Sequence, residues 1–83
     1  IAQKTVRERL AEILMHLDDE FGEDSQGILN ISLTREELSN IVGTATESII
    51  RLLSEFKSLG YIEISGRKIK ILDKPGLKYI ANI

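Results

Sequence analysis

Apolar side chains recur at helical spacing in two long stretches of the chain. In residues 2–21 the intervals between successive apolar positions are four, three, one, three and four, the pattern of one buried helical face. These positions are Val6, Leu10, Ile13, Leu14, Leu17 and Phe21. A second stripe of the same period, in residues 44–59, consists of Ala45, Ile49, Leu52, Leu53, Phe56 and Leu59. We therefore predict two long helices whose apolar faces form the core; the first has no evident cap.

Capping signals between these stripes predict a short helix and a tight turn. Thr34 and Glu37 have the spacing of a capping box, and Leu33 with Leu38 can form a hydrophobic staple. The expected buried face of this helix is Leu38, Ile41 and Val42. Gly43 follows where a left-handed residue would end the helix. Two helices joined by a short turn that contains glycine predict a helix-turn-helix over residues 34–60.

Alternation of apolar and polar residues after Gly60 predicts a β-hairpin. A two-residue turn at Gly66 and Arg67 places isoleucine opposite isoleucine, whereas a slip of one residue would place isoleucines opposite charges. The expected pairs are Ile62 with Ile71, Glu63 with Lys70, and Ile64 with Ile69. This hairpin, residues 61–72, would be a wing with a basic tip. Basic residues at a sheet edge also discourage strand addition, and that alternative stays open.

Two shorter patterns complete the predicted fold. Residues 28–33 alternate with a period of two, which indicates a strand that joins the hairpin in a small antiparallel sheet. Asp73 as N-cap and Pro75 in the first turn indicate a short final helix. Its inward residues would be Leu77, Ile80 and Ala81, with Lys74 and Lys78 outside. The predicted class is α+β, mainly α: one winged helix-turn-helix domain of residues 1–83 with a three-helix core.

Composition and charge fit one small globular domain. Of 83 residues, 42% are hydrophobic and 29% charged, cysteine is absent, and no apolar run could span a bilayer, so we expect a cytoplasmic protein. With a net charge of -2, the chain as a whole lacks the excess of basic residues that is typical of DNA-binding domains. However, residues 1–42 carry four basic and nine acidic residues, whereas residues 43–83 carry seven and four. Salt screens charges beyond roughly 10 Å, so the local balance decides.

The polar face of the helix at 44–59 carries groups that could contact base edges. Glu47 and Arg51 lie four residues apart near its N-terminus. A carboxylate can accept from cytosine, a guanidinium can donate two hydrogen bonds to guanine, and Ile50 could touch a thymine methyl. Three alternatives stay open: Glu47 closes a capping box with Thr44, Glu47 and Arg51 form an ordinary surface ion pair, or Ile50 is the edge of the core.

No motif in the sequence predicts an enzyme. The chain has no glycine-rich phosphate loop, no G-x-S-x-G motif and no pair of His and Cys. The single histidine, His16, has Glu12, Asp19 and Glu20 on the same helical side, which could ligate a metal. One exposed histidine among acids is more often solvated surface, so we predict no metal site.

The helix-turn-helix and the wing together resemble a known family. The segment reads LTREELSNIVGTATESIIRLL and is followed by SLGYI and the hairpin ISGRKIKI. From about Val6 to the last helix, the chain resembles the C-terminal winged helix-turn-helix of the Crp/Fnr superfamily of bacterial transcription regulators. The most specific part is the E-S-x-x-R of Glu47, Ser48 and Arg51. The resemblance implies that a dimeric regulator binds double-stranded DNA, with helix 44–59 in the major groove of an inverted-repeat operator with a TGA-like core.

The resemblance also implies roles for individual residues. In the family the matching Glu and Arg contact bases, and the residue that matches Ser48 contacts phosphate. A further base-contacting position, Arg in the cyclic-AMP-receptor branch, is Thr46 here, which is closer to the Fnr-like branch; that branch usually has Ser at the position of Ile50. The predicted base-contacting residues are Glu47, Arg51, Thr46 and Ile50. The predicted phosphate contacts are Thr34, Thr44, Ser48, Ser65, Gly66, Arg67 and Lys68.

The resemblance further implies parts and partners outside this chain. Because the sequence starts at Ile1 without an initiator Met, we expect a fragment preceded by a sensory domain and a dimerisation helix, with residues 1–21 as the next helix. We expect no cofactor in this domain, whereas the sensory domain could bind a small-molecule effector. Loop 22–27 matches a loop that touches RNA polymerase in some members; simple connection is the alternative.

A second function class stays open at the level of sequence. A winged helix can serve protein–protein contact in place of DNA binding, because fold alone does not determine function. The acidic isoelectric point of about 5.4 favours this alternative. It predicts little affinity for any duplex and a function that is insensitive to Arg51.

Overall fold

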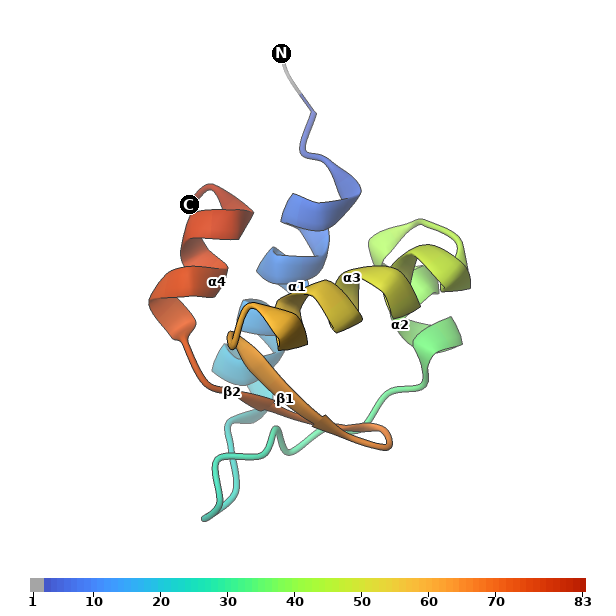
Figure 1. Ribbon diagram of the computed structural model, residues 1–83. Coiled ribbons are helices and arrows are strands. Elements are labelled where there is room, and N and C mark those ends of the chain that lie inside the picture. Colours follow the sequence, from blue (N-terminus) through green and yellow to red (C-terminus); the bar gives the residue numbers. More distant parts are fainter. Residues whose placement is uncertain (1–2) are drawn as a thin grey trace.

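The computed structural model describes residues 3–83, which form four helices and one hairpin. The elements are α1 (Val6–Phe21), α2 (Arg35–Val42), α3 (Thr46–Ser58), β1 (Ile62–Ser65), β2 (Lys68–Ile71) and α4 (Lys74–Ala81). In Figure 1, α1 lies in the middle, with α4 on one side and α2 on the other, and α3 crosses in front of it. This is the predicted α+β winged helix-turn-helix, mainly helical.

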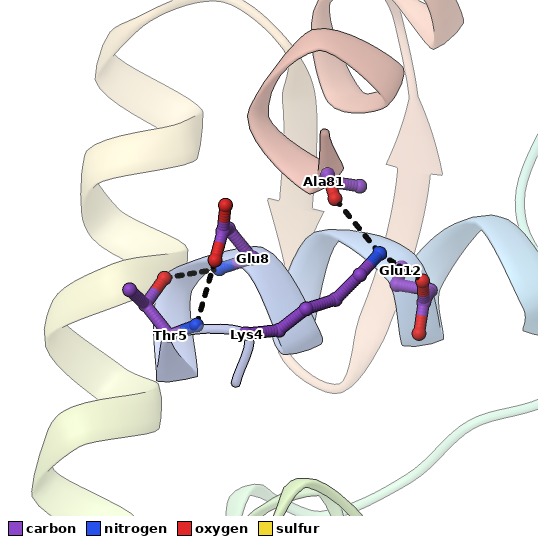
Figure 2. A network of polar contacts seen from close by, with 5 residues as sticks. All are labelled: Lys4, Thr5, Glu8, Glu12 and Ala81. Carbon is purple, nitrogen blue, oxygen red and sulfur yellow. Dashed lines mark hydrogen bonds and ion pairs between the residues drawn. The ribbon is translucent and has the colours of Figure 1, made fainter. Parts of the chain in front are cut away.

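α1 begins at the first residue of its apolar stripe, Val6, which is later than the predicted start at residue 2. The hydroxyl of Thr5 accepts from the Glu8 backbone N–H at 3.1 Å, and the Glu8 carboxylate accepts from the Thr5 N–H at 2.7 Å (Figure 2). The prediction of an uncapped helix from residue 2 is therefore wrong at residues 3–5, because a capping residue takes an extended conformation. Position 2 lies outside the described residues. Beside this cap, Lys4 pairs with Glu12 and donates to the Ala81 carbonyl at 3.0 Å, which joins this segment to α4.

The two predicted stripes meet in one core. Its largest fully buried side chains are Phe56, Leu10, Leu14, Leu38, Ile49, Leu53, Ile62 and Leu77. The prediction of burial is wrong at the ends of both stripes. Phe21 and Leu59 are about half exposed, and Ala45 is exposed at the N-cap of α3. Ile41, near the end of α2, is also half exposed. Helical periodicity gives the side of a helix that is buried, but it does not show where the neighbouring element ends.

The hairpin has the predicted register. Ile62 pairs with Ile71, Glu63 with Lys70, and Ile64 with Ile69. The predicted strand at 28–33 is wrong: within the described part of the chain, this segment makes one isolated bridge to the hairpin, from Ile28 to Lys70. On the edge that faces β2, the Leu29 N–H donates to the Ile69 carbonyl at 2.9 Å. On the opposite edge, the segment pairs with its own loop through a bridge from Leu29 to Glu23, where the Asn30 N–H donates to the Gly22 carbonyl at 3.0 Å. The segment is thus held between the loop and the hairpin by isolated bridges and does not form a regular strand.

α4 starts at the predicted cap and is tied to α1. The Asp73 carboxylate accepts from the Gly76 N–H at 2.9 Å, and Leu77, Ile80 and Ala81 are buried as expected. Lys74 Nζ lies 3.0 Å from an oxygen of Asp18 and 3.4 Å from one of Glu23. Hydrogen bonds to Asp18 and then to Glu23 raise the pKa of Lys74. The nearly buried Asp18 thus has a cationic partner, and α4 is fixed against the end of α1.

Candidate nucleic-acid interface

α3 separates its apolar and polar side chains onto opposite sides. Ile49, Leu52, Leu53 and Phe56 are buried against the rest of the fold. Glu47, Ile50 and Arg51 are exposed within the first two turns, so the outer side of the N-terminal half combines an acid, a base and an apolar group. A helix with its N-terminal half free on the outside is able to enter a DNA groove.

Glu47 forms neither a capping box with Thr44 nor an ion pair with Arg51 in the described residues. The N-cap of α3 is Ala45, which makes no side-chain capping bond, so Thr44 lies one residue too early for a capping box with Glu47. Among residues 3–83, no ion pair within 4.0 Å joins Glu47 to Arg51. Both charged side chains are therefore exposed and are not paired with each other.

Ile50 and Thr46 differ in how far they are available to a partner. Ile50 is 49% exposed and is not part of the core cluster, so about half of its side chain is available to a partner. Thr46 Oγ1 lies 3.3 Å from Ser39 Oγ, and Ser39 donates its own proton to the Glu36 carbonyl at 2.6 Å. Thr46 must then be the donor to Ser39, because a hydroxyl has only one proton. The Thr46 hydroxyl thus fixes α3 against α2 and keeps only acceptor capacity for another partner.

Two of the predicted phosphate contacts, Thr44 and Ser48, lie in the turn between α2 and α3 and in the first turn of α3. Gly43, at φ +84°, closes α2, and the N–H groups of Gly43 and Thr44 both donate to the Ser39 carbonyl, at 2.8 and 3.0 Å. Thr44 and Ser48 are half-buried beside the N-terminus of α3. A helix N-terminus carries a partial positive charge and unpaired N–H groups, both of which favour an anion.

The start of α2 forms the predicted capping box. The Thr34 hydroxyl accepts from the Glu37 N–H at 3.0 Å, and the Glu37 carboxylate accepts from the Thr34 N–H at 2.8 Å. The Thr34 backbone N–H and then its side chain lower the pKa of Glu37, and the charge of Arg67 lowers it further. Arg67 belongs to the wing, whose tip is also bonded to the first residue of α2 through Arg35.

The wing tip is exposed and directly bonded to α2. Ser65, Gly66, Arg67 and Lys68 are all exposed, and Gly66 has φ +62°, a conformation that favours glycine. Arg35 Nη2 donates to the Gly66 carbonyl at 3.1 Å, a contact between residues 31 positions apart. Sequence reasoning missed Arg35, because periodicity and capping motifs carry no signal for a bond of this range.

The structure thus joins some predicted site residues and leaves others apart. Arg35 bonds the wing tip to the helix that Thr34 caps, and Ser39 bonds Thr44 and Thr46 to α2. In Figure 1 the tip of the hairpin extends toward the side of the molecule where α2 lies. Glu47, Ile50 and Arg51 have no such tie, and they remain on the open side of α3.

The described residues offer neither a metal site around His16 nor a membrane-spanning helix. His16 is exposed, with Nε2 3.9 Å from a Glu20 oxygen, and residues 3–83 contain no group of three or more His, Cys, Asp or Glu side chains arranged to hold a metal ion. Within the same range, no helix has the length and apolar character needed to cross a membrane.

Three helices, a tight glycine turn and a basic hairpin define a winged helix-turn-helix. The chain belongs to the Crp-like helix-turn-helix domain family, whose model matches residues 8–80. This family is a DNA-binding module of transcription regulators and has no enzymatic role. The resemblance to the Crp/Fnr superfamily predicted from the helix-turn-helix and the wing is thereby confirmed.

Individual relatives agree with this membership. The chain is 31% identical to the transcriptional activator protein FnrA of Stutzerimonas stutzeri, over 98% of this chain and 34% of that protein. It is 34% identical to electron transport regulator A of Shewanella oneidensis, over 98% of this chain and 33% of the relative. A solved CRP/FNR-family regulator of Thermus thermophilus superposes with a TM-score of 0.84 at 29% identity, over 96% of this chain and 42% of the other. The chain therefore spans about one third of the length of these curated relatives.

Proposed function

We propose that this chain binds double-stranded DNA sequence-specifically, as the C-terminal domain of a dimeric Crp/Fnr-type bacterial transcription regulator. The observation that carries the proposal is the outer face of α3, where Glu47, Ile50 and Arg51 are exposed near the helix N-terminus. The local uses that would otherwise explain the two charges, a capping box and an ion pair with each other, are absent from residues 3–83.

Each side chain on this face matches a group in the major groove. The Arg51 guanidinium fits the O6 and N7 acceptors of guanine, the Glu47 carboxylate fits the amino group of cytosine, and Ile50 fits a thymine methyl. Thr46 could add an acceptor contact, since its proton is used by Ser39. A TGA-like core, as the family resemblance implies, contains thymine and a guanine–cytosine pair.

The polar residues around α3 would contact the phosphate backbone. Thr44 and Ser48 lie at the N-terminus of α3, Thr34 lies at the N-terminus of α2, and the wing tip is exposed and basic. The tip contacts proposed are Ser65, Gly66, Arg67 and Lys68. Phosphate contacts of this kind fix the orientation of a protein on DNA but carry no sequence information of their own.

The full-length regulator would bind as a homodimer in the bacterial cytoplasm. Two-fold symmetric proteins of this class place two recognition helices about one helical turn apart, so the operator would be an inverted repeat. The curated relatives are about three times as long as this chain, which leaves room for a dimerising part and for a sensory domain that binds an effector.

A contact with RNA polymerase through loop 22–27 is a further part of the proposal. Backbone N–H groups of Ile28 and Gln26 donate to Asp24, which lowers the pKa of this carboxyl group and gives the loop a defined shape. In Figure 1 the loop protrudes at the bottom of the view, away from α3. If the loop contacts polymerase, Gln26→Ala in the full-length regulator should reduce transcription activation in vitro without changing operator affinity. Unchanged activation would refute this contact.

Salt-dependent titration of duplex DNA tests the proposed function. We expect Lys68→Ala to weaken binding of all sequences equally and to reduce the slope of log affinity against log salt by about one, because one phosphate contact is lost. Lys78→Ala is the matched control, since it removes the same charge from the exposed side of α4. Failure of the wild-type chain to bind any duplex at low salt would instead favour the protein–protein contact that the acidic isoelectric point suggests.

A further inference from the structure

The wing is a short hairpin with little support of its own. β1 and β2 have four residues each and form a two-stranded sheet. The isolated bridge from Ile28 reaches β2 at Lys70, two residues past the start of that strand, and leaves the turn at Gly66 and Arg67 beyond it. Two-stranded hairpins alone are marginally stable in water, so the position of this tip depends on contacts with other elements.

Arg35 supplies such a contact from the first residue of α2. Its Nη2 donates to the Gly66 carbonyl at 3.1 Å, and its Nη1 is buried without a hydrogen-bond partner among residues 3–83. One end of the guanidinium therefore lies inside the protein while the other holds the tip. Because the guanidinium is planar and rigid, packing of one nitrogen also fixes the direction of the other.

The same two elements are also linked by charge. Arg67 lies close enough to Glu37 for its charge to lower the pKa of that carboxyl group. Glu37 in turn closes the capping box with Thr34, one residue before Arg35. The start of α2 thus faces the wing tip with a negative charge near Arg67 and a hydrogen-bond donor for the Gly66 carbonyl.

We propose that Arg35 is a positioning residue for DNA binding, which holds the wing tip at a fixed place beside the N-terminus of α2. The proposed phosphate contacts of Thr34, Arg67 and Lys68 would then be ordered before DNA arrives, so less conformational entropy is lost on binding. The effect on affinity rests on the proposed DNA-binding function. The hydrogen bond from Arg35 to the Gly66 carbonyl, called the clamp below, is a property of the free protein.

The clamp is tested first without DNA. We expect the backbone amides of Gly66 and Arg67 in Arg35→Ala to show lower heteronuclear NOE values than in the wild-type chain, while amides of α1 stay unchanged. Arg35→Lys keeps the charge and the aliphatic stem, and it serves as the second variant if alanine unfolds the domain. Its single ammonium cannot reproduce the fixed fork, so a smaller change in the same direction is expected. A tip as ordered in the variants as in the wild type would overturn the clamp.

The consequence for binding is tested with a double-mutant cycle on duplex DNA. Arg35→Ala should weaken binding about two- to tenfold, the range set by the net contribution of one hydrogen bond. In an Arg67→Ala, Lys68→Ala background it should weaken binding far less, because the tip it positions no longer contacts phosphate. An equal loss in both backgrounds would mean that Arg35 acts independently of the wing and would overturn the proposal. Lys78→Ala controls for the loss of one charge, and a wild-type chain that binds no duplex would refute the proposed function while the NMR result still decides the clamp.

Discussion

At the scale of single residues, hydrogen bonds at the start of α2 make stability depend on pH. The folded protein lowers the pKa of Glu37 below its usual value of 4.5, through the Thr34 backbone N–H first. Because the folded state binds this proton more weakly than the unfolded state, the resulting stabilisation is present above about pH 4.5. It is lost as the pH falls through the lowered pKa.

Glu37→Gln should therefore flatten the acid side of the stability curve. The glutamine amide oxygen can still accept from the Thr34 N–H, but it does not titrate in this range. Urea unfolding followed between about pH 5 and pH 3 should show a smaller loss of stability in the variant than in the wild type. Glu36→Gln removes an exposed acid from the same turn and is the matched control. The pH profile of the wild type retained in Glu37→Gln would contradict this account.

Individual capping residues were only partly predictable from sequence. The box of Thr34 and Glu37 and the cap at Asp73 were both predicted and are confirmed. The box of Thr5 and Glu8 has the same spacing, yet it was not recognised, and the first helix was predicted to start at residue 2. The capping motif was the better signal for where α1 begins, because the N-cap residue has a non-helical backbone conformation.

At the scale of elements, a glycine determines how closely α4 approaches the hairpin. A Cβ atom on Gly76 would lie 2.7 Å from Tyr61 Cε1 and 2.8 Å from an Asp73 oxygen. Both distances are too short for real contacts, so either the ring or the cap must move. The short separation between α4 and Tyr61 thus depends on the absence of a side chain.

Gly76→Ala should destabilise the domain by about 1–3 kcal/mol, the usual cost of overpacking. This runs against helix propensity, which alone would favour alanine by about 1 kcal/mol. Chemical denaturation of the variant measures the difference. In a Tyr61→Ala background the same substitution should cost less, because the ring is gone; an equal cost in both backgrounds would be incompatible with a clash at Tyr61.

Elements with a short-range signal were predicted better than elements that depend on tertiary contacts. The register of β1 and β2 followed from the pairing of isoleucines, and it is confirmed. Residues 28–33 also alternate, but they form only two isolated bridges, one from Ile28 to Lys70 of the hairpin and one from Leu29 to Glu23 of the loop before them. An alternating pattern shows which side of a segment faces the core and does not show which partner satisfies its backbone.

At the scale of the whole molecule, the fold brings together groups that no local pattern connects. Arg35 meets the Gly66 carbonyl from 31 residues away, and Thr46 donates to a Ser39 that is itself buried. The first contact holds the wing tip, and the second holds α3 against α2. Sequence reasoning placed the candidate site on α3 but could not show which hydroxyls and cations the fold already uses.

The uneven distribution of charge also acts at this scale. The net charge of -2 hides an acidic first half and a basic second half, and the second half contains α3 and the wing. An approaching polyanion would be drawn to that half at short range, because salt screens the more distant acids. The acidic isoelectric point is thus compatible with a local DNA-binding surface.

In vitro selection from randomised duplex DNA tests the central claim most directly. The chain, joined to a dimerising coiled coil, should enrich an inverted repeat with a G·C-containing core. Arg51→Ala should lose the preference at its base, at a cost of about 1–3 kcal/mol. Lys57→Ala removes the same charge from the last turn of α3 and should keep the preference. Enrichment of the same core by Arg51→Ala, or of no sequence by the wild type, would contradict the account.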